Sequence, residues 1–120
     1  MQPLTPLEQG IVVGVLIGEG SFGGDGKQPQ ITLRMHVRHE ALFHWLMDRF
    51  PRTRLYGPYG HDGRRYYQWM ARGPALVDDV LPVLEAVLGD DLDGYAAQRL
   101  RDMCVRYASF IDRMRRPDDD

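Results

Sequence analysis

Cysteine is almost absent from the sequence: Cys104 is the single one among 120 residues. An internal disulfide is therefore impossible, and a zinc site is excluded because no cysteine–histidine cluster has suitable spacing. A lone thiol among apolar helical positions is typical of a buried cysteine in a reducing compartment. These features favour a cytoplasmic protein.

Long apolar runs are missing as well. The longest, Ile11 to Ile17, is interrupted by Gly14 and is far shorter than the roughly 20 residues that a membrane-spanning helix needs. No positively charged segment precedes it, which argues against a secretory signal. The chain has no internal repeat and no low-complexity segment. We therefore expect a single domain over residues 1–116 with no membrane partner, followed by a disordered acidic tail at residues 117–120.

Basic residues are concentrated in the middle of the chain, although the net charge is −2. Residues 27–72 contain nine Lys and Arg against three Asp and Glu, or +6, whereas residues 1–26 carry −3 and residues 73–120 carry −5. A localised basic surface on an acidic protein is typical of polyanion binding. A solvated basic face without a partner is the alternative that charge alone leaves open.

Short-range patterns predict alternating helices and hairpins. Thr5-Pro6-Leu7-Glu8 is a capping box with proline at the first helical position, so a helix should run from about residue 6 to residue 18. Alternating polar and apolar residues around glycine-rich turns predict hairpins at 20–37 and 52–71. Helical periodicity predicts helices at 39–50, 74–88 and 92–114. The expected fold is α+β, with the order α-β-β-α-β-β-α and an additional C-terminal helix.

Three glycines recur every four residues in the first predicted helix: Gly10, Gly14 and Gly18. They therefore share one face of the helix. Each glycine destabilises a helix by roughly 1 kcal/mol relative to alanine, and close approach of another helix is the natural compensation. The rest of this helix is apolar nearly all round, so we expect it to be buried on several sides.

Residues 12–22, VVGVLIGEGSF, resemble the LAGLIDADG motif in its GEGSF form, in which an apolar helix ends in an acid flanked by glycines. Together with the order of elements, the resemblance to the LAGLIDADG homing endonucleases covers about residues 6–88, although Ile17 replaces the family's first aspartate. Because the chain has one motif, the resemblance implies a homodimer that binds double-stranded DNA at a near-palindromic site. The implied dimer interface comprises Gly10, Val13, Gly14, Ile17 and Gly18.

Glu19 ends the first helix, where the helix dipole disfavours an anion by about 0.3–1 kcal/mol. Two such carboxylates that meet across a two-fold axis repel one another and favour a divalent cation. Magnesium (or manganese) suits a site with few protein carboxylates, and the resemblance implies Glu19 and the Gly18 backbone carbonyl as its ligands. The alternative is an exposed glutamate at a helix end with no function.

The resemblance also implies two further catalytic residues. His39, near the start of the second helix, is a candidate to hold a metal-bound water or is a bystander; Arg72 closes the fourth strand, where the family usually has lysine. Arg72 is suited to stabilising negative charge that develops on a phosphate. The strands offer groups that read base edges in the major groove, or else ordinary solvent-facing polar residues. The candidates for DNA binding are Gln30, Thr32, Arg34, His36, Arg38, Arg54, Tyr56, Arg65, Tyr67 and Gln68.

The sequence thus predicts a homodimeric, sequence-specific endonuclease that hydrolyses phosphodiester bonds of double-stranded DNA with a divalent metal. The alternative is a non-cleaving DNA- or RNA-binding protein of the same fold, a regulator or a maturase. Glu19 favours the enzyme, because a binder that does not cut has no reason to keep a carboxylate beside a phosphate. A protein-interaction domain is a third possibility, against which the basic middle segment argues.

Overall fold

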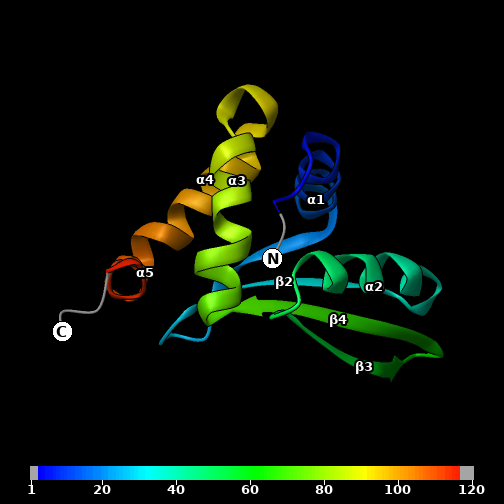
Figure 1. Cartoon of the computed structure of the whole chain (residues 1–120). Coiled ribbons are helices and arrows are strands. Elements are labelled where there is room, and N and C mark those ends of the chain that lie inside the picture. The colour runs from blue at the N-terminus through cyan, green and yellow to red at the C-terminus, as the bar shows by residue number, and fades with distance from the viewer. Residues whose placement is uncertain (1–2, 117–120) are drawn as a thin grey trace.

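The structure, a computed structural model, describes residues 3–116 (Figure 1). It confirms the predicted α+β fold and the predicted order of helices and strands. The acidic tail predicted at residues 117–120 lies outside the described residues. The elements are α1 (Pro6–Glu19), β1 (Gly20–Gly24), β2 (Pro29–His36), η1 (Val37–His39), α2 (Glu40–Arg49), β3 (Arg54–His61), β4 (Arg64–Arg72), η2 (Ala75–Val80), α3 (Leu81–Val87), α4 (Asp90–Arg106) and α5 (Ala108–Arg115).

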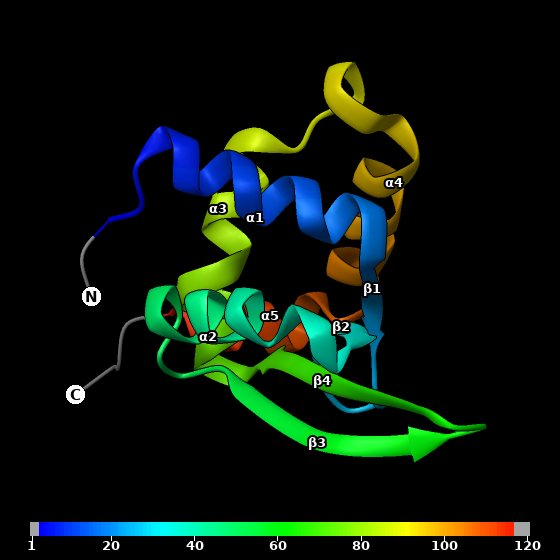
Figure 2. The same cartoon turned by 90° about the vertical axis from the view of Figure 1, so that its right-hand side faces the viewer.

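The four strands form one antiparallel sheet in the order β1-β2-β4-β3. Helices α1, α2 and α3 lie on one side of this sheet, and the other side is uncovered (Figures 1 and 2). Strand β2 shows the consequence, because Ile31 and Leu33 are fully buried against the helices while the alternate residues Gln30, Thr32 and Arg34 are accessible. The sheet therefore has one core face and one open face.

Helix α1 begins at the predicted capping box. The Glu8 backbone N–H donates to Thr5 Oγ1 at 3.2 Å, and the Thr5 N–H donates to Glu8 Oε1 at 2.9 Å. The helix buries Val12 and Leu16 completely or almost completely. Each such side chain stabilises the fold by roughly 1.5–3 kcal/mol. Glu8 also pairs with Arg49 Nε at 2.7 Å, which ties the start of α1 to the end of α2.

The C-terminal helix predicted over residues 92–114 is two helices, which corrects that prediction. Helix α4 ends at Arg106 and α5 begins at Ala108, because Tyr107 leaves helical geometry at φ −110° and ψ 26°. Its buried ring packs against Gly24, where a side chain would collide with it, and its hydroxyl accepts a hydrogen bond from the Gly26 N–H at 3.0 Å. Through these contacts, Tyr107 holds the C-terminal helices against the β1–β2 turn.

The helix predicted over residues 74–88 opens with a π-helical turn, η2, before α3 continues it. The Leu81 N–H bonds to the carbonyl of Leu76, five residues earlier. Pro82 follows and has no amide hydrogen, so a regular α-helical bond to the Asp78 carbonyl is impossible here. None of the helices in residues 3–116 combines the length and the apolarity needed to cross a membrane.

Candidate nucleic-acid interface

The open face of the sheet carries the polar row of β2 that the sequence predicts. Strand register determines which residues of the neighbouring strands share this face, because side chains directly opposite each other point the same way. Gln30, Thr32, Arg34 and His36 pair with Arg72, Met70, Gln68 and Tyr66 of β4, and Arg54 and Tyr56 of β3 pair with Met70 and Gln68.

These strands have an unusual charge balance. Together, β1, β2, β3 and β4 contain five arginines and not one Asp or Glu. Within residues 3–116, the acidic side chains lie in helices and turns. Strand register places four of these arginines among the alternate residues that point to the open face: Arg34, Arg54, Arg64 and Arg72. The basic middle segment of the sequence is therefore gathered on one surface.

Tyr67, a predicted DNA-binding residue, points to the helix side of the sheet and not to the open face. Its ring meets Phe43 edge-on, with 5.7 Å between ring centroids, and its hydroxyl donates to Glu40 Oε1 at 2.8 Å. This hydrogen bond to Glu40 raises the pKa of Tyr67. Arg65 lies two residues before Tyr67 in β4, so it belongs to the same alternating set and not to the residues of the open face. Arg64 and Tyr66, which the sequence analysis missed, lie on the open face instead.

Glu19 is exposed at the end of α1, and its carboxylate makes no hydrogen bond or ion pair with any residue from 3 to 116. On the exposed side of α1, a Cβ added at Gly10, Gly14 or Gly18 would meet no atom of residues 3–116 within 4 Å outside the adjacent backbone of the helix itself. Packing within the chain therefore gives no reason for these glycines. Their face also exposes the apolar Leu7 (75%) and Ile11 (39%), which the sequence analysis did not assign to it.

Val13 belongs to the predicted dimer interface, but the structure places its side chain elsewhere. This side chain is only 1% exposed, so it belongs to the core of its own chain. Ile17 is half-buried. The exposed stripe of α1 consists of Leu7, Gly10, Ile11, Gly14 and Gly18.

The three catalytic candidates do not form one cluster. Within the described residues, no hydrogen bond or ion pair joins Glu19, His39 and Arg72, and no group of three His, Cys, Asp or Glu side chains is arranged to hold a metal. Arg72 is opposite Gln30, which lies three residues along β2 from the partner of Gly20. At about 3.3 Å per residue, this places Arg72 roughly 10 Å along the strands from the end of α1.

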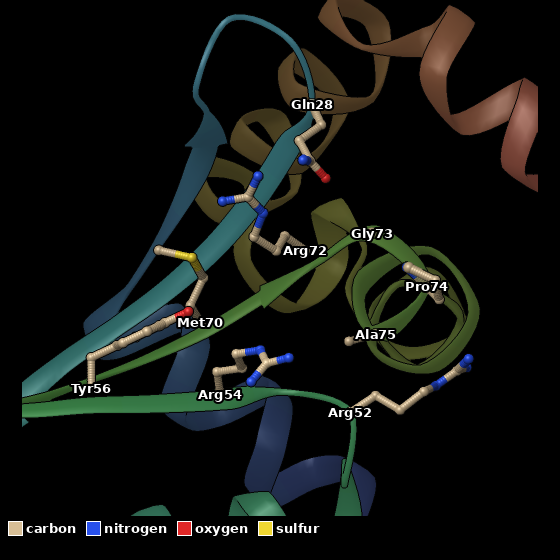
Figure 3. Close-up of a pocket in the computed structure, with 9 residues that line it drawn as sticks. All are labelled: Gln28, Arg52, Arg54, Tyr56, Met70, Arg72, Gly73, Pro74 and Ala75. Atoms are coloured by element: carbon tan, nitrogen blue, oxygen red, sulfur yellow. The ribbon is translucent and has the colours of Figure 1, made fainter.

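Arg72 lines a pocket of about 410 Å³ at the end of the sheet, where Arg54 and Arg72 project from neighbouring strands opposite the start of η2 (Figure 3). Arg72 reaches Asp25 Oδ2 at 3.4 Å, and Asp25 Oδ1 accepts from the backbone N–H groups of Gln28 and Lys27 at 2.9 and 2.8 Å. Those backbone hydrogen bonds, assisted by Arg72, lower the pKa of Asp25. Arg72 in this pocket therefore already faces an anion of the protein.

Arg52 on the rim of this pocket has a structural role. Its Nε and Nη2 atoms donate to the nearly buried Asp79 carboxylate at 2.8 and 2.7 Å. The hydrogen bond to Asp79 raises the pKa of Arg52. Of the lining arginines, Arg54 alone has no ion pair with residues 3–116, so it is available to an incoming anion.

Comparisons with known proteins give matches of structure only. No family model and no curated protein matches the sequence. Among solved structures, the chain is similar to the group I intron-encoded homing endonuclease I-CeuI complexed with DNA, with a TM-score of 0.70 and 14% identity over 93% of this chain and 59% of that one. It is also similar to the LAGLIDADG homing endonuclease I-LtrWI bound to target DNA (TM-score 0.53, 15% identity, 95% of this chain, 45% of that one).

A third similar structure is the homing endonuclease I-TnaI, with a TM-score of 0.54 and 17% identity over 98% of this chain and 92% of that one. The chain thus spans 59% and 45% of the first two proteins and nearly all of the third. At these identities the likeness concerns the course of the backbone, and it agrees with the resemblance seen in residues 12–22. The chain has the fold of the LAGLIDADG homing endonucleases.

Proposed function

We propose that this protein binds double-stranded DNA on the open face of its sheet and cleaves it as a metal-dependent homodimer. The observation that carries the proposal is the composition of that face: four strands with five arginines, several amide and hydroxyl groups and no carboxylate. Two of the structurally similar proteins are complexes with DNA. Strands of this kind fit the major groove and pair with base edges and phosphates.

Dimerisation through α1 accounts for its exposed stripe. Leu7 and Ile11 would be removed from water, and Gly10, Gly14 and Gly18 would let a second α1 approach closely. A near-palindromic DNA site is the expected partner of such a two-fold dimer. In this arrangement the two Glu19 carboxylates, one from each chain, converge at the end of the interface.

The groups at the end of α1 suit magnesium or manganese. Glu19 offers a carboxylate that has no partner in residues 3–116, and the last carbonyls of a helix, Gly18 among them, lack partners within it. Oxygen donors of this kind fit these ions when phosphate and water complete the shell. Bound beside a phosphodiester, such an ion polarises the phosphorus and activates water. Arg54 and Arg72 hold and orient the DNA backbone.

A second candidate function is DNA binding without cleavage. It is favoured by the separation of Arg72 from Glu19 and by the Asp25 carboxylate beside Arg72. Substitution of Glu19 distinguishes the two functions, because the exposed side chain makes no contact on which the fold depends.

The test is Glu19→Gln, assayed for duplex binding and for cleavage in magnesium. We expect binding to persist and cleavage to fall by at least about 100-fold, since the carboxylate is the anionic ligand. Glu85→Gln is a matched control on α3, where the carboxylate pairs with Arg115 on the protein surface. Cleavage that survives Glu19→Gln would place the active site elsewhere, whereas wild-type binding without any cleavage would favour the non-cleaving function.

A further inference from the structure

One corner of the sheet contains a recess. Strand β2 ends at His36, opposite Tyr66, whereas β4 continues to Arg64 with β3 as its one neighbour. The chain turns away from β2 into η1 at this point. The resulting recess has a volume of about 460 Å³ and is lined chiefly by Arg34, His36, Arg38, Arg64, Arg65 and Tyr66.

The recess concentrates positive charge without compensation. None of its lining residues is acidic, and none of its four arginines forms an ion pair with residues 3–116. This distinguishes it from the pocket at the other end of the sheet, where Arg52 and Arg72 face carboxylates. Guanidinium groups held this close repel one another unless an anion lies between them.

Two of the arginines are held in place by neutral partners. Arg34 donates to Gln68 Oε1 at 2.8 Å and lies 4.9 Å from the centre of the Tyr66 ring. Arg38 donates to His36 Nδ1 through its backbone N–H at 3.0 Å and through Nε at 3.2 Å. These contacts orient the side chains but leave most of their N–H donors free for a ligand.

His36 adds another donor. Since its Nδ1 accepts hydrogen bonds, the proton of the neutral ring is on Nε2. Burial of the ring, together with the charges of Arg38, His39 and Arg64, lowers the pKa of His36. The charged neighbours that lower this pKa are thus all cationic or titrate to cations.

We propose that this recess is a phosphate-binding subsite, which holds a backbone phosphate of nucleic acid beside the bases that the open face reads. Several arginine forks and a ring N–H match the oxygens of a phosphate. Nucleic acid is the source that the structure favours, because Arg34, His36 and Tyr66 belong both to the recess and to the open face. The assignment rests on the proposed function for the identity of the ligand.

The first experiment titrates the protein with inorganic phosphate and follows the imidazole resonances of its histidines by NMR, with sodium chloride at matched ionic strength as reference. We expect a saturating shift of His36 that exceeds those of the exposed His44 and His61. Arg38→Gln and Arg64→Gln should each weaken the phosphate affinity by roughly 10-fold. Equal shifts of His36, His44 and His61 would overturn the subsite.

The second experiment measures duplex affinity against salt concentration. Arg64→Gln should flatten the slope of log K against log [salt] by about 0.9, the value for one lost phosphate contact. Arg99→Gln is the matched control, because Arg99 lies on α4 and contacts Tyr95 on the same helix. If the wild type binds duplex but the two variants behave alike, nucleic acid is not the ligand and the inference is wrong. If the wild type binds no duplex, the proposed function fails, and the phosphate titration still decides whether the recess binds anions.

Discussion

At the scale of single residues, Asp25 and Arg72 should determine how accessible the proposed DNA-binding face is to phosphate. The Asp25 carboxylate is fixed by two backbone N–H groups and lies 3.4 Å from Arg72. A phosphate that approaches Arg72 therefore meets an anion of the protein. Both side chains are partly exposed, so solvent weakens the pair without removing it.

Asp25→Asn should raise duplex affinity by roughly 2- to 5-fold, because it removes the competing charge while the amide oxygen still accepts the turn's N–H bonds. Fluorescence anisotropy with a labelled duplex at fixed salt measures this change. Asp62→Asn, in the β3–β4 turn beside His61, is the control for lost negative charge. An Asp25→Asn affinity no higher than that of Asp62→Asn would show that Arg72 does not contact DNA.

If His36 contacts a phosphate of the duplex as proposed, we expect duplex binding to depend on pH. In the free protein, burial and the neighbouring cations keep the pKa of His36 below its ordinary value of about 6.5. A bound phosphate raises that pKa, so binding takes up a proton. Affinity should be highest below the pKa of the free protein and should fall as pH rises through the pKa of the complex.

Anisotropy titrations between pH 5.5 and pH 8 should therefore show tighter binding at the acidic end, within the usual range of histidine titration. His36→Gln should remove a part of this dependence while His44→Gln, on the exposed side of α2, leaves it unchanged. An identical pH profile for wild type and His36→Gln would contradict a role for the ring.

At the scale of elements, α1 has room for a side chain at Gly14 in the monomer but not in the proposed dimer. The monomer has room for a side chain at Gly14, since an added Cβ would meet nothing within 4 Å. Packing of two α1 helices leaves no such room.

Gly14→Leu should thus leave the monomer folded, or stabilise it by up to about 1 kcal/mol through helix propensity, while it disrupts self-association. Sedimentation velocity gives the oligomeric state, and thermal unfolding of the same sample reports the fold. Glu85→Leu adds a leucine to an exposed position outside the stripe and is the control. A Gly14→Leu protein that associates as the wild type does would remove α1 from the interface.

The hydrogen bond that Tyr107 accepts at the break between α4 and α5 should contribute measurably to the free energy of unfolding. Tyr107→Phe keeps the ring, which is 5% exposed, and deletes the acceptor of the Gly26 N–H. The free energy of unfolding should fall by about 1 kcal/mol, the usual contribution of such a bond. Urea unfolding measures it, with Tyr95→Phe on the exposed surface of α4 as control. Equal stability of the two variants would mean that water replaces the lost acceptor.

The sequence predicts those features of the fold whose signals lie within a few neighbouring residues. The capping box at Thr5 and the alternation in residues 30–37 depend on neighbours in sequence, and the structure shows both. In β4, aromatic residues occupy both alternating sets, so the pattern did not show that Tyr67 faces the helices. Val13 beside the glycines, the break at Tyr107 and the recess at His36 depend on tertiary contacts that no local pattern contains.

At the scale of the whole molecule, the two sides of the sheet differ in their role. The helices cover one side of the sheet (Figures 1 and 2), and the core lies there. Strand register places arginines from strands that lie far apart in the sequence on the open side. The net charge of −2 conceals this separation, because the acids of residues 3–116 lie in helices and turns and not in the strands. A protein of this kind approaches a polyanion with one face only.

The most direct measurement incubates the protein with a randomised duplex library, once in magnesium and once in calcium, and sequences the bound and the cut molecules. We expect one near-palindromic sequence to be bound in both ions and cut in magnesium. Failure to enrich any duplex in either ion would contradict this expectation, because the arginine-lined face of the sheet would then have no DNA partner.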